Sequence, residues 1–220
     1  MALVDKEDLE LSRARATVYS WLSRLFRREA DHELLAGLIE VDLVREWGVL
    51  GSSGQEESRV LCDLAGDYAY TFLIGEGSVH PYESAYTSDK GLLMQDAFRD
   101  ARRCYADAGF SVSDVSGEMD DHIALELEFM ARLAERLSAA LLQGDEDSAR
   151  SLLERQRAFH RVHLHWVVRF ADDAEARART AFYRKAARLL ADVVSSDIAF
   201  MDDLDSALSS SALSRASAVA

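Results

Sequence analysis

Proline and glycine are scarce in this chain: its 220 residues include one proline and eleven glycines. Both residues interrupt helices, whereas Ala, Leu, Arg and Glu, which favour helices, are common here. The composition therefore predicts long helices rather than many short strands. A chain of this length buries one large core or two small ones, and no second region differs in composition, so we expect a single all-α domain.

Cysteines and long apolar runs are also scarce. The two cysteines, Cys62 and Cys104, lack the CxxC spacing of metal and redox sites, so we expect neither a disulfide framework nor a zinc site. The first residues, MALVDKEDLELSRARA, lack the apolar stretch of a signal peptide, and no run approaches about eighteen apolar residues. These absences predict a cytoplasmic protein without an integral membrane segment.

Positive charge is outnumbered: 25 Lys and Arg residues face 39 Asp and Glu residues, which gives a formal net charge of −14. This field repels nucleic acid backbones and anionic lipid headgroups, so we expect no nucleic acid partner. The same field attracts a basic peptide and speeds its encounter. Acidic charge also serves solubility alone, and the charge by itself leaves both explanations open.

The common catalytic motifs are missing. The chain has no GxGxxG, Walker loop, GxSxG or HExxH string, which excludes the commonest motif-bearing enzyme classes but not enzymes in general. His160, His163 and His165 offer nitrogen ligands, so the alternative is an uncharacterised helical metal-binding enzyme. Because no Glu-x-x-His pairing accompanies them, we instead place His163 at a helix interface with Trp166 and expect no metal and no cofactor.

The spacing of apolar residues predicts the helices and the segments between them. We expect a flexible connection over 48–57, a structured loop over 75–91, and a second polar loop over 111–117. Residues 1–205 should form the domain, and the Ser/Ala-rich residues 206–220 a flexible tail. The helix from 119 to 143 carries two apolar stripes and should be central and largely buried. The other helices are expected over 9–28, 31–39, 60–72, 92–108, 145–170 and 174–194.

The richest polar cluster is the string EMDDHIALELE, with Glu118, Asp121, His122 and Glu126 within about two helical turns. A carboxylate beside a histidine can tune its proton affinity or orient it as a metal ligand. The alternative is an acidic helix N-terminus favoured by the helix dipole, with His122 held in place by a neighbouring carboxylate. The aromatic residues are expected to lie mostly in the core.

Three segments resemble the TorD/DmsD/NarJ-type family of chaperones for molybdenum-cofactor oxidoreductases. The first is HPYESAYTSDKGLLMQ, followed by YADAGF at the end of the next helix. The second and most specific is EMDDHIALELEFMARL, and the third is QRAFHRVHLHWVVRF followed by TAFYRKAARLL. Their order and spacing match from about residue 69 to 190, over half of the chain.

The resemblance implies a single-domain helical bundle of the TorD-like type, with roughly eight to ten helices. It implies a cytoplasmic chaperone, monomer or homodimer, for a molybdoenzyme catalytic subunit. Such a chaperone binds the twin-arginine leader, the apo form of the subunit, or both, and assists cofactor insertion and proofreading before export. The residues expected to contact the client and its leader are Tyr82, Glu83, Ser84, Tyr86, Glu118, Asp121, His122 and Trp166.

A groove between helices can meet the chemical requirements of such a leader, which bears two arginines and an apolar stretch. Aromatic and aliphatic side chains accept the apolar part, and carboxylates pair with the arginines. We expect affinity to come mainly from apolar burial and specificity from the placement of charge.

Overall fold

The computed structural model describes residues 4, 6–40, 54–111 and 117–219. These residues form nine α-helices and a single π-helical turn, η1, with one isolated β-bridge and no strand, so the predicted all-α class is confirmed. None of the described helices combines the length and the apolar content that crossing a membrane requires. The elements are α1 (Lys6–Arg27), α2 (His32–Glu40), α4 (Gly54–Tyr68), η1 (Ala69–Leu73), α5 (Glu83–Thr87), α6 (Asp96–Asp107), α7 (Ile123–Gln143), α8 (Glu146–His163), α9 (Val167–Arg177) and α10 (Ala181–Val219).

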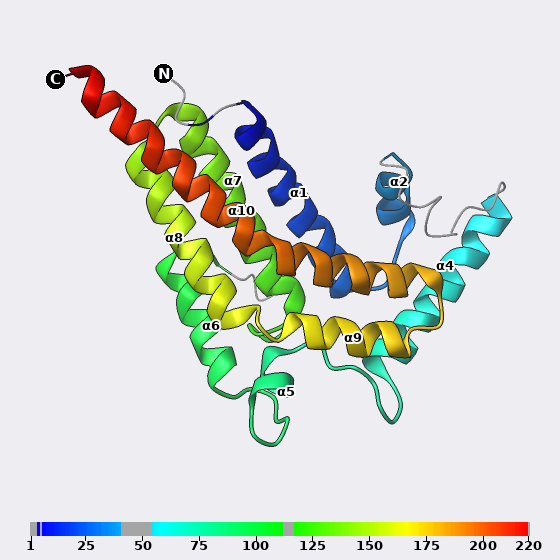
Figure 1. The fold of residues 1–220 in the computed structure, drawn as a ribbon. Coiled ribbons are helices and arrows are strands. Elements are labelled where there is room, and N and C mark those ends of the chain that lie inside the picture. The colour runs from blue at the N-terminus through cyan, green and yellow to red at the C-terminus, as the bar shows by residue number, and fades with distance from the viewer. Residues whose placement is uncertain (1–3, 5, 41–53, 112–116, 220) are drawn as a thin grey trace.

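Helix α7 is the central element, as its two apolar stripes predict. It is buried along most of its length and packs between α1 and α8 (Figure 1). Its N-cap is His122, so it begins four residues later than the expected 119. It ends at Gly144, whose φ of 73° is the left-handed conformation that glycine adopts at low cost.

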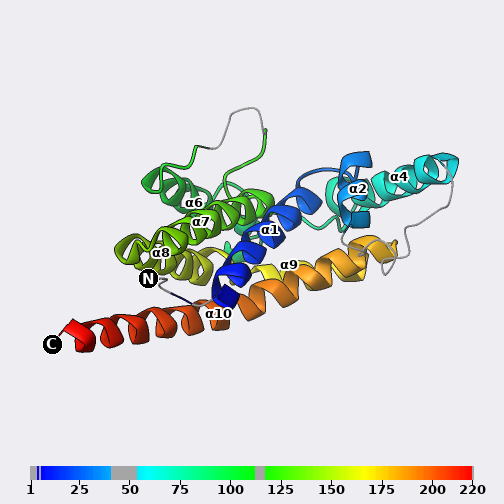
Figure 2. The same ribbon diagram turned by 90° about the horizontal axis from the view of Figure 1, so that it is seen from above.

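Helix α10 runs along the whole molecule and joins its two ends. Figures 1 and 2 show its first half beside α9 and α4 and its second half beside α8 and the start of α1. Aromatic residues of the main core lie around the first half. A second, smaller apolar cluster lies around the second half and consists of Leu137, Ala140, Leu141, Ala149, Leu153, Met201, Leu204 and Leu208.

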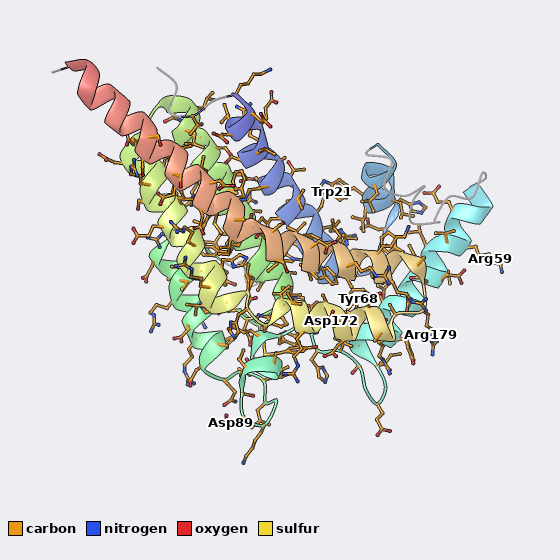
Figure 3. All side chains as sticks on the ribbon, viewed as in Figure 1. Trp21, Arg59, Tyr68, Asp89, Asp172 and Arg179 are labelled. Atoms are coloured by element: carbon orange, nitrogen blue, oxygen red, sulfur yellow. The ribbon has the colours of Figure 1, made fainter. Side chains whose placement is uncertain are left out.

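The C-terminal region differs from the expected single helix over 174–194. Asp67 of α4 accepts hydrogen bonds from the backbone nitrogens of Arg179 (2.9 Å) and Thr180 (2.8 Å), and it thereby fixes the turn before a new helix, α10, whose N-cap is Thr180. Figure 3 labels Arg179 at this junction. The helix then continues to Val219, across residues for which a flexible tail is expected from the sequence. Leu208 is fully buried there, and alanine favours the helix.

Further boundaries differ from the expected ones, and the helix expected over 145–170 is two helices, because α8 ends at His163 and α9 begins at Val167. The loop over 75–91 contains the short helix α5, and α6 begins at Asp96 rather than at 92. The expected connection over 48–57 lies mostly outside the described residues, and its end is already helical because α4 begins at Gly54. Trp47 and most of the second polar loop also lie outside the described residues.

Helices α1 and α2 approach closely at Trp21, which Figure 3 labels on the side of α1 that faces α2. A Cβ atom at Gly37 of α2 would lie 2.1 Å from the Trp21 ring, so only glycine fits there. Beyond this contact, Phe26 and Phe72 meet edge to face at 6.0 Å and join α1 to η1. These contacts place the end of α1 beside the loop that precedes α5.

Candidate functional site

The loop before α5 is paired with the segment that leads into α7. Ile123 donates its backbone N–H to the carbonyl of Pro81 (2.9 Å), and Glu83 donates to the carbonyl of Asp121 (2.9 Å). Tyr82 and His122 form an antiparallel bridge between these two bonds. Two of the three motif segments therefore lie side by side, although about forty residues separate them in sequence.

Asp121 and Ser84 fix α5 to this pairing. The Asp121 carboxylate accepts hydrogen bonds from the Ser84 backbone N–H (3.0 Å) and from the Ser84 hydroxyl. Both side chains are completely buried. In this structure they position the loop, and a client could contact them only if the loop moved.

His122 caps α7 and is neutral at neutral pH. Its Nδ1 accepts a hydrogen bond from the backbone N–H of Ala124 (3.0 Å), so the neutral ring carries its proton on Nε2, which lies 3.8 Å from Glu118 Oε2. Burial, with a smaller effect of the Arg27 charge, lowers the pKa of His122 to about 3. The Tyr82 ring packs edge to face on the imidazole, with 4.9 Å between ring centroids.

A second buried group joins α5, α7 and α8. His163 Nδ1 lies 2.8 Å from Glu83 Oε2, and its Nε2 lies 3.7 Å from the sulfur of Cys104. Trp166 donates its indole N–H to the His163 carbonyl (2.8 Å) and to Glu126 Oε2 (3.2 Å). The third motif segment, which carries His163 and Trp166, is therefore joined to the other two.

The protons in this group are set by burial and by neighbouring charge. Burial and the nearby Glu83 carboxylate raise the pKa of Glu126 well above its ordinary value. For His163, burial opposes protonation, but the hydrogen bonds to Cys104 and Glu83 prevail and raise its pKa to about 9. His163 is therefore an imidazolium paired with Glu83 at neutral pH.

Tyr82, Glu118 and Tyr86 are the expected site residues that reach the surface. The Tyr82 hydroxyl donates to Glu118 Oε2 (2.9 Å), and both residues line a recess of about 440 Å³ together with Leu73 and the edge of His122. The remaining lining residues are Arg27, Arg28, Glu29, Ala30, Asp31, Tyr68, Phe72 and Pro81. We call this the α1–loop recess.

Tyr86 faces a different recess, of about 550 Å³, between the loop and α9. Its hydroxyl donates to Asp173 (3.1 Å), its ring packs on Trp166 with 5.1 Å between centroids, and the Arg169 guanidinium lies 5.4 Å above it. Trp166 itself is buried. The eight expected residues thus divide into three at the surface and five beneath it.

Known proteins resemble this chain over most of its length. The profile of the nitrate reductase delta subunit family matches residues 27–172. Chaperone protein TorD of Photobacterium profundum is 28% identical over 215 residues, which cover 89% of this chain and 98% of that protein. TorD of Vibrio cholerae (strain N16961) is 31% identical over 212 residues, with coverage of 88% and 94%. The chain belongs to the TorD-like family of redox enzyme maturation chaperones.

A solved structure shows the same fold for this TorD-like chain. A protein described as a redox enzyme maturation protein from Archaeoglobus fulgidus superposes with a TM-score of 0.50 at 19% identity, over 82% of this chain and 93% of that one. The predicted helical bundle of the TorD-like type is therefore confirmed. Family membership supports a role as a maturation chaperone for a molybdenum oxidoreductase.

Some residues of this TorD-like site were not apparent from the sequence. Leu73 ends η1 and Ile74 follows it, and they are 59% and 64% exposed, unlike most large apolar residues that the structure describes. The signal available was their position just before Gly75, where the apolar helical pattern of α4 should already have ended. The pairing of Glu83 with His163 left no signal, because 80 residues separate the two.

The histidine set of the metalloenzyme alternative does not assemble. His160 Nε2 bonds the carbonyl of Val194 (2.8 Å) inside the core, whereas the exposed His165 bonds the carbonyl of Val162 (2.8 Å). Only His163 turns toward the motif residues, as the expected helix interface with Trp166 predicts.

Proposed function

We propose that this chain is a cytoplasmic chaperone that binds the twin-arginine leader, the apo form of a molybdenum oxidoreductase subunit, or both. In this role it assists cofactor insertion and proofreading before export, without catalysing a reaction. Membership of the TorD-like family and the net charge of −14 support the proposal. The observation that carries it is the α1–loop recess, where apolar and acidic side chains meet beside the motif residues.

The apolar wall of the recess suits the apolar stretch of a leader. Leu73, Phe72 and Pro81 line the recess, and the exposed Ile74 follows Leu73 in the sequence. Burying one leucine side chain contributes about 1.5–3 kcal/mol, so two such residues account for much of the affinity of a peptide. Leu73 and Ile74 are then exposed in the free chain because a binding surface must remain accessible to the leader.

The acidic rim suits the two arginines of the leader. Glu118 and the exposed Glu29 both line the recess, and a guanidinium can pair with a carboxylate through two parallel hydrogen bonds. Arg27 and Arg28 also line the recess, but Arg27 is paired with Glu128 and Arg28 with Asp31. An exposed pair contributes only about 0–1 kcal/mol, so these carboxylates select the leader more than they hold it.

The buried motif residues support this surface from below. Ser84 with Asp121, and Glu83 with His163, hold the loop against α7 and α8. Tyr82 is thereby fixed between His122 and Glu118. We propose that all eight motif residues serve client binding, three by contact and five by positioning.

A peptide titration tests the surface. The probe is a synthetic peptide with two adjacent arginines followed by an apolar stretch, measured by calorimetry against the full chain. Leu73→Asp should weaken binding by about tenfold or more, since one leucine contact is lost. Leu92→Asp is the matched control, because Leu92 is 53% exposed but lies outside the recess. Equal affinities for the two variants would contradict the assignment of this surface.

The charge selection needs a second peptide in which both arginines are alanine. Wild-type chain should prefer the arginine peptide, and Glu118→Gln should reduce that preference by up to about fivefold, as expected for one partly exposed pair.

To identify the client class, the full chain is used to capture proteins from bacterial cytoplasm. Enrichment of one leader-bearing molybdoenzyme subunit supports the function, and capture without any such subunit counts against it.

A further inference from the structure

We propose that Glu83, Glu126 and His163 form a binding site for a divalent transition-metal ion, with Zn²⁺ the best match to its ligands. One carboxylate oxygen of each glutamate and one ring nitrogen of His163 lie within 4.8 Å of one another. The three residues come from α5, α7 and α8 and are all buried. This site differs from the expectation drawn from the sequence, which assigned no metal.

The distances suit a small cation. Zinc binds histidine nitrogen and carboxylate oxygen at about 2.0–2.2 Å, which separates the ligand atoms of a tetrahedral shell by about 3.4 Å. Glu83 and His163 lie slightly closer than this, at 2.8 Å, and the cluster as a whole is slightly wider. Side-chain shifts of a few tenths of an ångström to about one ångström therefore bring the three protein ligand atoms to zinc distance, and the second oxygen of one carboxylate or a water bound with the ion would be the fourth ligand.

The charges suit a cation of charge two. Two carboxylates and an imidazole share a volume from which water is excluded, and two buried negative charges require compensation. Either two protons or one divalent ion provides it. Glu126 Oε1 is buried and receives no hydrogen bond from any described residue, so this oxygen is available as the ligand atom.

Neighbouring groups hold the ligands as they do in known metal sites. Trp166 donates its indole N–H to the other oxygen of Glu126 (3.2 Å). The second nitrogen of His163, Nε2, faces the sulfur of Cys104 at 3.7 Å, which can accept its N–H. Such outer contacts orient the ligands and raise their affinity for the metal.

A metal at this position would be structural. The ligands are sealed beneath the loop, with exposed fractions of 3% or less, so no site remains open to a substrate. The ion would join α5 to α7 and α8 and would enter as the chain folds. It lies beneath the α1–loop recess rather than in it, so leader binding and metal binding can succeed or fail independently.

Refolding with metal tests the site. The full chain is unfolded with a chelator, refolded with a small excess of Zn²⁺ or Co²⁺, desalted, and analysed for metal by mass spectrometry. We expect about one ion per chain, and visible absorption typical of tetrahedral Co²⁺. Less than about a tenth of an ion per refolded wild-type chain would overturn the proposal, and the cluster would then hold protons.

Matched variants assign the ligands. Glu126→Gln keeps the shape of the side chain but should lower metal affinity by about tenfold or more. Glu128→Gln is the control, because Glu128 is on the same helix but pairs with Arg27 and Arg132 outside the cluster. Circular dichroism confirms that each variant is folded. Metal retained with wild-type affinity by folded Glu126→Gln would also overturn the proposal.

Discussion

Two groups of buried polar side chains hold this molecule together, and their charges are balanced in different ways. The first, between α1, α8 and α10, is a matched pair: Arg15 donates to both oxygens of Asp197 (2.5 and 2.8 Å). Gln156 and Tyr19 complete it, since Gln156 accepts from Arg15 (3.1 Å) and the Tyr19 hydroxyl donates to Asp197 (2.7 Å). One cation therefore faces one carboxylate whose oxygens both accept hydrogen bonds.

The second group, beneath the motif loop, has an excess of acceptors. Within the described part of the chain, Glu83, Asp121 and Glu126 have one cationic partner, His163. Glu126 Oε1 and Asp121 Oδ1 receive no hydrogen bond from the described residues. In the first group one donor, Arg15 Nη1, also has no partner among the described residues, but the charges of Arg15 and Asp197 balance each other, whereas the unpaired acceptors of the second group are completed by a proton or a cation. The difference is the reason why we place the proposed metal ion in the second group.

The largest expected effect is in the matched pair. Asp197→Ala leaves the Arg15 guanidinium buried without a carboxylate, which should reduce the free energy of unfolding by about 3–5 kcal/mol. Urea denaturation followed by circular dichroism measures this. The control is Glu175→Ala, which removes the partner of the mostly exposed Arg188 and should leave the stability nearly unchanged. Similar losses of unfolding free energy in the two variants would show that the buried pair stabilises the fold no more than the exposed pair does.

The next effect is a pH dependence that comes from His122. The pKa of His122 is about 3 in the folded chain and ordinarily 6.5. Between these two pH values the unfolded chain therefore binds a proton at His122 and the folded chain does not. Stability from this residue is therefore complete above pH 6.5 and falls as the pH decreases toward 3, by about 1.4 kcal/mol per pH unit. The groups facing it are Glu118, Arg27 and the ring of Tyr82.

His122→Asn isolates that contribution. Asparagine can still cap α7 but does not titrate, so the variant should lose about 2–3 kcal/mol less than wild type between pH 6.5 and 4.5. Urea titrations of both chains at these two values give the difference, in which the carboxylates common to both cancel. Parallel stability curves for the two chains would mean that His122 is not held neutral in the fold.

The helices could be predicted from local patterns. The helix ends could not be predicted where a residue distant in the sequence determines them. The stripes of α7 follow directly from the spacing of Leu127, Met130 and Leu137. The break between α9 and α10 depends on Asp67, which is more than a hundred residues earlier in the sequence. The continuation to Val219 depends on Leu208 finding a place in the smaller core. Neither Asp67 nor the residues that pack against Leu208 can be identified from the sequence near the helix ends that they determine.

For the candidate site, the motifs indicated which segments matter but not how deep their residues lie. Polar residues such as Ser84 and Asp121 are usually exposed, so a sequence pattern favours a surface role for them. The structure buries them because each satisfies the other across two chain segments. Burial of a polar residue depends on a partner brought by the tertiary fold, and that information is spread over the whole chain.

The smallest expected effect concerns Asp121 in the second group, and it shows whether a further loss of hydrogen-bond donors weakens that group. Ser84→Ala removes one hydroxyl donor from Asp121 and leaves the backbone N–H of residue 84 in place, so we expect a loss of about 1.5–3 kcal/mol in unfolding free energy, toward the lower end. Because Asp121 Oδ1 already lacks a donor, the variant should also loosen the loop. Hydrogen exchange at Glu83 and Ile123, whose N–H groups pair the loop with α7, should then quicken more than exchange at the centre of α7. Unchanged protection at both positions, together with lost stability, would show that Ser84 supports the core as a whole and does not position the loop.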